Sequence, residues 1–280
     1  MKVTFSSQNN NSSKLQKQKI AFEAGLTPKM IEEIRNVDVL EISKRLEGKG
    51  IPNDFQGNKV LAWGSDKTVE LFEQFNERFG TNISLPKAIF AINFKHLNTE
   101  TPHAYGICNL TRTKLIKGSN EIIPSRIVFF NTEHNWDNIN PIADARYAKG
   151  TIGTDFFLYP MIHEYTHVAH EDYLLSQFDG KTVAKKITSA KKPYKTFIYR
   201  MKYGDRISQI CKNALIDPFE TIACDMPIRL INSIDKETLK PIKNPFVGTP
   251  YEKGLISQEY SYRKRPLPEI LGNIWNGKFD

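Results

Sequence analysis

Residues 160–170 read PMIHEYTHVAH, and this stretch decides how the rest of the sequence is interpreted. It lies within a segment of helical periodicity, and we predict a helix over residues 155–178, with Pro160 as the alternative start. His163 and His167 are four residues apart, so on a helix their imidazoles leave the same face one turn apart. The spacing therefore predicts that both histidines can reach one metal ion.

Glu164 follows the first histidine directly, and this arrangement is typical of a hydrolytic zinc site. Zinc accepts imidazole nitrogen, tolerates an open position for water, and lowers the pKa of that water toward about 7. A neighbouring carboxylate can take the proton of the water during attack on a carbonyl and later pass it to the leaving amine. We therefore predict one bound Zn²⁺, with His163 and His167 as ligands and Glu164 as the general base.

The HEYTH sequence at 163–167 resembles the HExxH motif of the zincin metallopeptidases, and a weaker similarity in element order covers residues 58–225. The resemblance implies an α+β fold, in which a small mixed sheet packs on the HExxH helix and a helical C-terminal part follows. It also implies hydrolysis of peptide bonds in a peptide or protein substrate. In this family an edge strand before the active helix binds the extended substrate, and residues 126–130 (RIVFF) match it. The same run also fits an ordinary core strand.

A catalytic zinc usually has three protein ligands, so one ligand must lie outside the motif. The metzincin extension HExxHxxGxxH is absent, because His170 and Tyr173 occupy its glycine and final histidine positions. Gluzincins take a glutamate from a later helix, and the run LIDPFETIACD at 215–225 offers Glu220. No histidine follows His170, which also favours a carboxylate as the third ligand. The alternative is a capping box, because Asp217 and Glu220 have its spacing and Glu220 would then bind a backbone N–H.

Asp225 and His170 are the candidates for residues that support the ligands without binding the metal. Asp225 follows the proposed third ligand and offers a carboxylate that can orient a ligand histidine. His170 lies seven residues after His163, and seven residues of helix rise about 10 Å. It is therefore too far along the helix to share an ion with His163, and we expect either such a supporting role or a purely structural one.

The order of the other expected elements supports the α+β class, because strands are followed by helices. Short apolar and β-branched runs predict strands at 58–63, 88–94, 104–110 and 126–130. Helices are predicted from Pro28, over 37–46 and from Ser65 to Gly80. We predict four regions in all: a disordered tail at 1–20, N-terminal helices at 21–54, a catalytic core at 55–180, and a basic connection with a helical C-terminal part at 181–280 that supplies the third ligand.

The formal net charge of +8 is concentrated in one part of the chain. Residues 181–215 contain ten basic residues and one acidic residue, which gives +9 and leaves −1 for the remainder. A solvated lysine-rich connection is favoured over a nucleic-acid partner, because the segment carries no recognition motif for DNA or RNA.

Composition places the chain among globular proteins, with 40% hydrophobic and 25% charged residues. The three cysteines form no CxxC pair, which predicts free thiols in a reducing compartment. No apolar run reaches the roughly 18 residues of a membrane span. The first residues have no apolar segment of the kind found in secretory signals, so we expect a cytoplasmic protein or one exported without a Sec-type signal.

Two other functions compete with a general zinc endopeptidase. A SprT-like, DNA-associated protease is suggested by the Gly-x-Cys of Gly106 and Cys108 and by the basic segment, but such proteins supply a third histidine soon after the motif. A metal-free binding or scaffold protein of zincin fold is the other alternative. The oligomeric state does not follow from the sequence.

Overall fold

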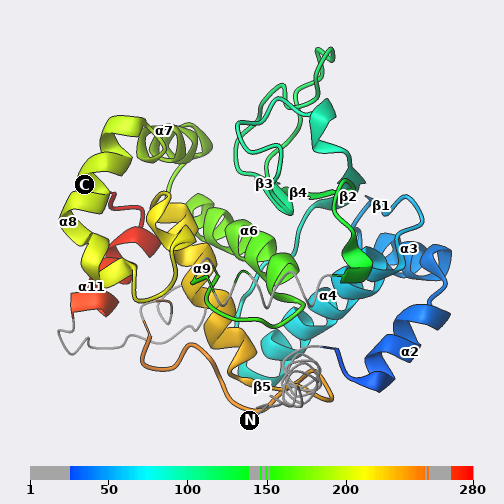
Figure 1. Ribbon diagram of the computed structural model, residues 1–280. Helices are drawn as coiled ribbons and strands as arrows, with labels where there is room; N and C mark the ends of the chain where they lie inside the picture. The colour runs from blue at the N-terminus through cyan, green and yellow to red at the C-terminus, as the bar shows by residue number, and fades with distance from the viewer. Residues whose placement is uncertain are drawn as a thin grey trace, which may run out of the picture.

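A computed structural model describes residues 26–138, 146, 149–150, 152–249, 251 and 266–279. The tail predicted at 1–20 lies outside these residues. Helices and a small mixed sheet make up the described chain, which confirms the α+β class at this coarse level (Figure 1). Within the described ranges, no helix combines the length and the apolar character that crossing a bilayer requires.

The main sheet has four strands in the order β1-β2-β4-β3. Their bounds are β1 Asn53–Asp54, β2 Ala88–Ile92, β3 Gly106–Asn109 and β4 Ile127–Asn131. β1 and β4 both pair with β2 in parallel, whereas β3 pairs with β4 antiparallel. The strands predicted at 88–94, 104–110 and 126–130 are thus confirmed with slightly different bounds.

The edge position predicted for residues 126–130 is wrong. β4 pairs with β2 on one side and with β3 on the other, so its backbone has no free edge. β3 precedes β4 in the chain but folds back outside it and forms the edge of the sheet beside α6 (Figure 1). The order of strands within a sheet depends on pairing between distant segments, which the local pattern of residues 126–130 does not contain.

Alternating side chains of the strands face two separate cores. One face of the sheet contributes to the main core beneath the helices, through Ile89, Ala91, Cys108, Val128 and Phe130. The opposite face contributes to a smaller core closed by the long connections around the strands, through Ala88, Ile127 and Phe129. Burial on both faces explains why residues 127–130 of β4 are a continuous apolar run.

A single long helix, α4 (Lys59–Phe79), replaces the strand predicted at 58–63 and the helix predicted from Ser65. Asn58 caps it by accepting a hydrogen bond from the backbone N–H of Leu61. A short apolar run fits a buried strand and a buried helix equally well, because it is too short to show a period. The strand predicted at 58–63 was wrong for this reason. Gly64 lies at a close approach of α4 to α6, where an added Cβ would lie 2.9 Å from Met161 Cε and the flexible end of that side chain would have to shift.

Two helices precede the sheet, α2 (Pro28–Asn36) and α3 (Val39–Gly48). Thr27 and Asp38 cap them through side-chain hydrogen bonds, so both predicted N-terminal helices are confirmed. Both helices pack on α4 and belong to the main core.

The remaining helices surround α6 (Tyr159–Gln177), which lies at the centre of the molecule (Figure 1). Its neighbour α9 (Pro218–Ile231) packs along it, and α11 (Pro266–Trp275) covers the end of that pair. The basic segment 181–215 is not an irregular connection, because most of it forms α7 (Gly180–Ala190) and α8 (Pro193–Ile207). Smaller elements are the 3-10 turns Phe94–His96, Trp136–Asn138 and Asn213–Leu215 and the pair β5 (Ile234–Asp235) and β6 (Lys240–Pro241).

Candidate metal centre

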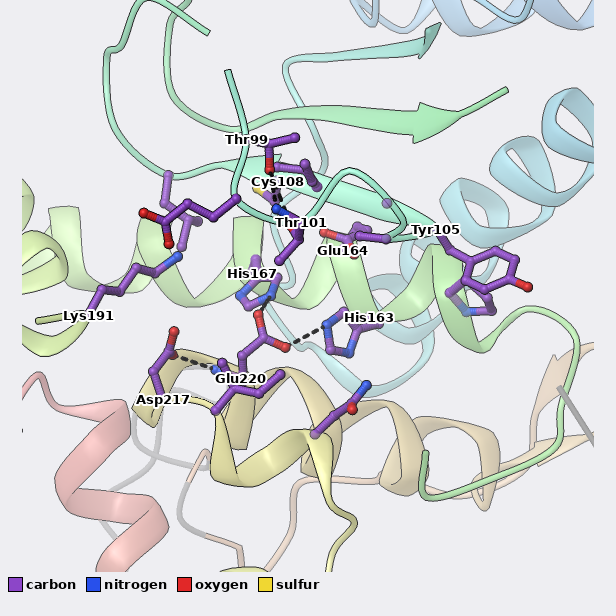
Figure 2. Close-up of a pocket in the computed structure, with 18 of the residues that line it drawn as sticks. Thr99, Thr101, Tyr105, Cys108, His163, Glu164, His167, Lys191, Asp217 and Glu220 are labelled. Atoms are coloured by element: carbon purple, nitrogen blue, oxygen red, sulfur yellow. Dashed lines mark hydrogen bonds and ion pairs between the residues drawn. The ribbon is translucent and has the colours of Figure 1, made fainter. Parts of the chain in front are cut away.

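The two histidines of the HEYTH sequence leave α6 on the side that faces α9 (Figure 2). They are one helical turn apart, and only 9% of His163 and 4% of His167 is exposed. α6 is buried on most of its circumference, because the sheet, α4 and α9 all contact it. The imidazoles are therefore held inside the protein while their edges face a cleft.

Asp217 and Pro218 determine where α9 begins. Pro218 occupies the first helical position, and Asp217 accepts hydrogen bonds from the backbone N–H groups of Phe219 and Glu220 at 2.7 and 3.0 Å. Glu220 does not complete a capping box with Asp217, because its carboxylate oxygens lie beside His163 and His167 on the neighbouring helix. It points toward α6 (Figure 2).

The three side chains converge on one point. Glu220 Oε2 lies 3.2 Å from His163 Nε2, and Glu220 Oε1 lies 3.3 Å from His167 Nε2. One ligand atom from each residue lies within 4.8 Å of the others, and among the described residues no other trio of His, Cys, Asp and Glu meets this condition. Two ligands of a tetrahedral zinc lie roughly 3.3 Å apart, so the separations suit such an ion. They also suit a hydrogen-bonded ion pair between the carboxylate and a protonated imidazole.

The electrostatics of the trio favour a positive charge between these side chains. Burial by itself lowers the pKa of His163, but the hydrogen bond and negative charge of Glu220 outweigh it and raise this pKa to about 9. Burial likewise raises the pKa of Glu220, but the positive charge of His167 and the hydrogen bonds from both imidazoles hold it well below its usual range. A proton or a metal cation can supply the positive charge.

Asp225 does not take the orienting role predicted for it. Its carboxylate accepts hydrogen bonds from Arg229 Nε at 2.6 Å and from Tyr251 Oη at 2.5 Å. The Nδ1 atoms of His163 and His167 are buried and have no hydrogen-bond partner. Asp225 lies five residues after Glu220, which turns it by about 140° around α9 and away from α6. The expected contact therefore fails for a geometric reason.

His170 has a purely structural role, which is one of the two roles expected for it. Its Nε2 is 3.1 Å from the backbone carbonyl of Trp275, and its ring stacks on the Trp275 indole at a centroid distance of 4.8 Å. Complete burial lowers the pKa of this imidazole to about 3, so it is neutral. His170 therefore connects α6 to α11 instead of supporting a ligand.

Glu164 leaves the other side of α6 and lies against the edge strand β3 (Figure 2). A Cβ on Gly106 would be only 2.6 Å from Glu164 Cγ and 3.0 Å from Glu164 Oε1, so the strand can approach this close only with glycine there. Burial raises the pKa of Glu164, although the positive charges of the two histidines oppose the shift. The carboxylate is thus close to the trio without belonging to it.

A cleft of about 830 Å³ opens over these groups. One wall is formed by residues 99–110, which include β3, and the other by α8 and the residues before α9. Glu164, His163, His167 and Glu220 all line it. β3 and the trio therefore line the same cleft.

Two features of the site were not anticipated from sequence. The Gly-x-Cys pattern drew attention to Gly106, but only the contact with Glu164 shows why a glycine stands there. Cys224 lies one turn after Glu220, and its buried thiol hydrogen-bonds Cys211, which lowers the pKa of Cys211 to about 7. No spacing signal links these cysteines, because the chain brings them together only through the turn before α9.

Comparisons with protein-family models, with curated proteins and with solved structures found no match to this chain.

Proposed function

We propose that this protein is a zinc-dependent endopeptidase, in which His163, His167 and Glu220 bind one Zn²⁺ and Glu164 is the general base. The observation that carries the proposal is the convergence of both Nε2 atoms on the two oxygens of one carboxylate, at 3.2 and 3.3 Å. Two imidazoles and a carboxylate are a ligand set that catalytic zinc sites use. The open cleft above the trio supports a site that is accessible to substrate.

The chain supplies separate groups for binding the metal and for moving protons. A zinc ion in this position would polarise a water molecule and the substrate carbonyl. Glu164, next to the trio but outside it, takes the proton of the attacking water and returns it to the leaving amine. Its raised pKa favours this role, because a more basic carboxylate is a better proton acceptor.

The edge of β3 is the proposed place for the peptide backbone. β3 pairs only with β4 among the described strands, and its outer edge lines the cleft, where the backbone N–H of Cys108 donates a hydrogen bond to Glu164. An extended peptide can add to such an edge through main-chain hydrogen bonds. The scissile bond would then lie between β3 and the trio, within reach of Glu164.

Turnover by the wild type and by Glu164→Gln tests the assignment. We expect the purified wild type to contain about one zinc per chain and to cleave unfolded protein substrates, with activity lost on chelation and restored by zinc. Glu164→Gln should retain zinc and fold while turnover falls by about 10²- to 10⁴-fold, because only the base is removed. Equal turnover in the two proteins would remove Glu164 from the mechanism. Absence of zinc binding would favour the metal-free scaffold.

A further inference from the structure

Helix α8 has one apolar face that stays exposed in the part of the chain that the structure describes. Tyr194, Phe197, Ile198 and Met201 have the spacing i, i+3, i+4, i+7 and share one side of the helix. Their exposed fractions are 67%, 62%, 40% and 75%. We call these four residues the α8 stripe. Large apolar residues grouped in this way on a surface mark an interaction site more often than single ones do.

The stripe is not required for the packing of α8 itself. The opposite side of the helix contributes Tyr199 and Ile207 to the main core, and the Tyr199 hydroxyl lies 2.7 Å from Thr221 Oγ1 on α9. Arg200 donates hydrogen bonds to the backbone carbonyls of Leu215 and Ile216 at 2.6 and 3.1 Å. α8 is thus attached by one side and lies at the outer edge of the molecule (Figure 1), and the side chains of the stripe are exposed.

The stripe continues into the cleft of the candidate metal centre. Phe197 belongs to the stripe and also lines the cleft, together with Ile216, which is 47% exposed. Ile216 lies four residues before Glu220, and β3 forms the wall across from it. A chain that leaves the cleft on this side can therefore reach the stripe through Phe197 and Ile216.

Basic residues lie beside the stripe. Helical spacing places Lys195, Lys202 and Arg206 together along one border of it. Asp205 is the only acidic residue between 181 and 215. Two longer segments lie outside the described residues, and their sequences carry net charges of +3 (1–25) and +2 (252–265). Charge complementarity therefore favours a partner other than these parts of the chain.

We propose that the α8 stripe and its basic border bind an apolar, acidic segment of the protein substrate, next to the segment that is cleaved. Identifying the bound segment as part of a substrate rests on the proposed peptidase function. A peptide is favoured over nucleic acid because a continuous phosphate backbone would have to pass the carboxylates Glu164, Asp217 and Glu220 of the adjacent cleft, whereas the acidic side chains of a peptide can lie outside the cleft. Continuity with a concave cleft favours it over a membrane surface, which would contact only the four outward side chains.

Peptide binding to the Glu164→Gln protein tests the proposal without turnover. Three fluorescent peptides of equal length serve as probes: one alternates Leu or Phe with Glu, the second has Lys in place of Glu, and the third has Ser in place of Leu and Phe. We expect the apolar, acidic peptide to bind best by anisotropy and to weaken with added salt. Adding Tyr194→Ser and Met201→Ser together should weaken its binding about tenfold or more.

Leu40→Ser is the matched control, because Leu40 is 62% exposed on α3 and lies outside the cleft lining. It should leave binding unchanged. Equal binding with and without the stripe substitutions would overturn the proposal, as would stripe-dependent binding of single-stranded DNA or phosphatidylserine vesicles that exceeds peptide binding. Zinc content is measured on the same samples. Stripe-dependent peptide binding by a chain that holds no zinc would contradict the peptidase assignment and leave the surface itself in place.

Discussion

Glu220 and Asp217 lie three residues apart at the start of α9, and the structure gives them different tasks. Glu220→Ala should lower zinc affinity strongly, because it removes the carboxylate that faces both imidazoles. Asp217→Ala should instead cost about 1 kcal/mol of unfolding free energy, because two backbone N–H groups lose their acceptor. Competition with a chromophoric chelator measures the first effect and denaturant unfolding the second. Unchanged zinc affinity in Glu220→Ala would exclude Glu220 as a ligand.

His163 provides a pH-dependent test of the same trio. In the metal-free protein its pKa is raised to about 9, so we expect it to be protonated at neutral pH. The ion pair therefore stabilises the metal-free fold fully below pH 6.5, the ordinary pKa, and this stabilisation is lost as the pH rises through about 9. Zinc must also displace this proton, so its apparent affinity should rise over the same range.

Histidine NMR of the metal-free protein measures this pKa directly. Glu220→Gln should bring the pKa of His163 down to 6.5 or lower, because burial then acts without the opposing carboxylate. Zinc titrations in buffers of different ionisation enthalpy count the protons released. A His163 pKa that is the same in both proteins would show that Glu220 is not its partner in solution.

Among the secondary-structure elements, β3 and α6 are in contact where Glu164, the proposed general base, is held. Gly106→Ala should displace Glu164, because the new Cβ would lie 2.6 Å from Glu164 Cγ. We expect turnover to fall by at least about tenfold, as for other small displacements of catalytic groups, while zinc content stays the same. Gly48→Ala on α3 is the control, because no heavy atom lies within 4 Å of its added Cβ. If Gly106→Ala were as active as Gly48→Ala, the close approach of β3 would be irrelevant to the reaction.

The basic segment shows the limit of interpreting elements by charge alone. Its lysines suggested a solvated connection, yet Val183, Ile187 and Tyr199 are buried and attach α7 and α8 to the core. Lysine is a good helix former, so a high lysine content does not argue against a helix. The apolar residues at helical spacing indicate two helices, whereas the number of charged residues does not distinguish a helix from an irregular connection.

At the scale of the whole molecule, we expect the protein to fold without the metal. The main core extends from Leu26 to Trp275 and does not depend on an ion, since the trio lies at the floor of a cleft beside it. Chelation should therefore leave the far-UV circular dichroism unchanged at 25 °C. Added zinc should raise the melting temperature, because a ligand at a thousandfold excess over its Kd stabilises the native state by about 4 kcal/mol. Loss of the helical signal on chelation would instead indicate a site that folds only with its metal.

The sequence by itself determined those features that are encoded locally. Helix α6 with two histidines on one face follows from period and spacing, and the start of α9 follows from the cap Asp217 and from Pro218. Strands β2, β3 and β4 follow from short runs of apolar and β-branched residues. Each of these signals lies within a few residues, so no knowledge of distant contacts was needed.

Only the tertiary structure decided how these pieces meet. It brought Glu220 to His163 and His167 across more than fifty positions of chain, turned Asp225 away from them, and placed β3 outside β4 at the edge of the sheet. It also showed that the strand predicted at 58–63 and the helix predicted from Ser65 form one helix over residues 59–79, which packs on α6. Local propensity and patterning act over a few residues, whereas strand order and side-chain convergence depend on packing between segments distant in sequence.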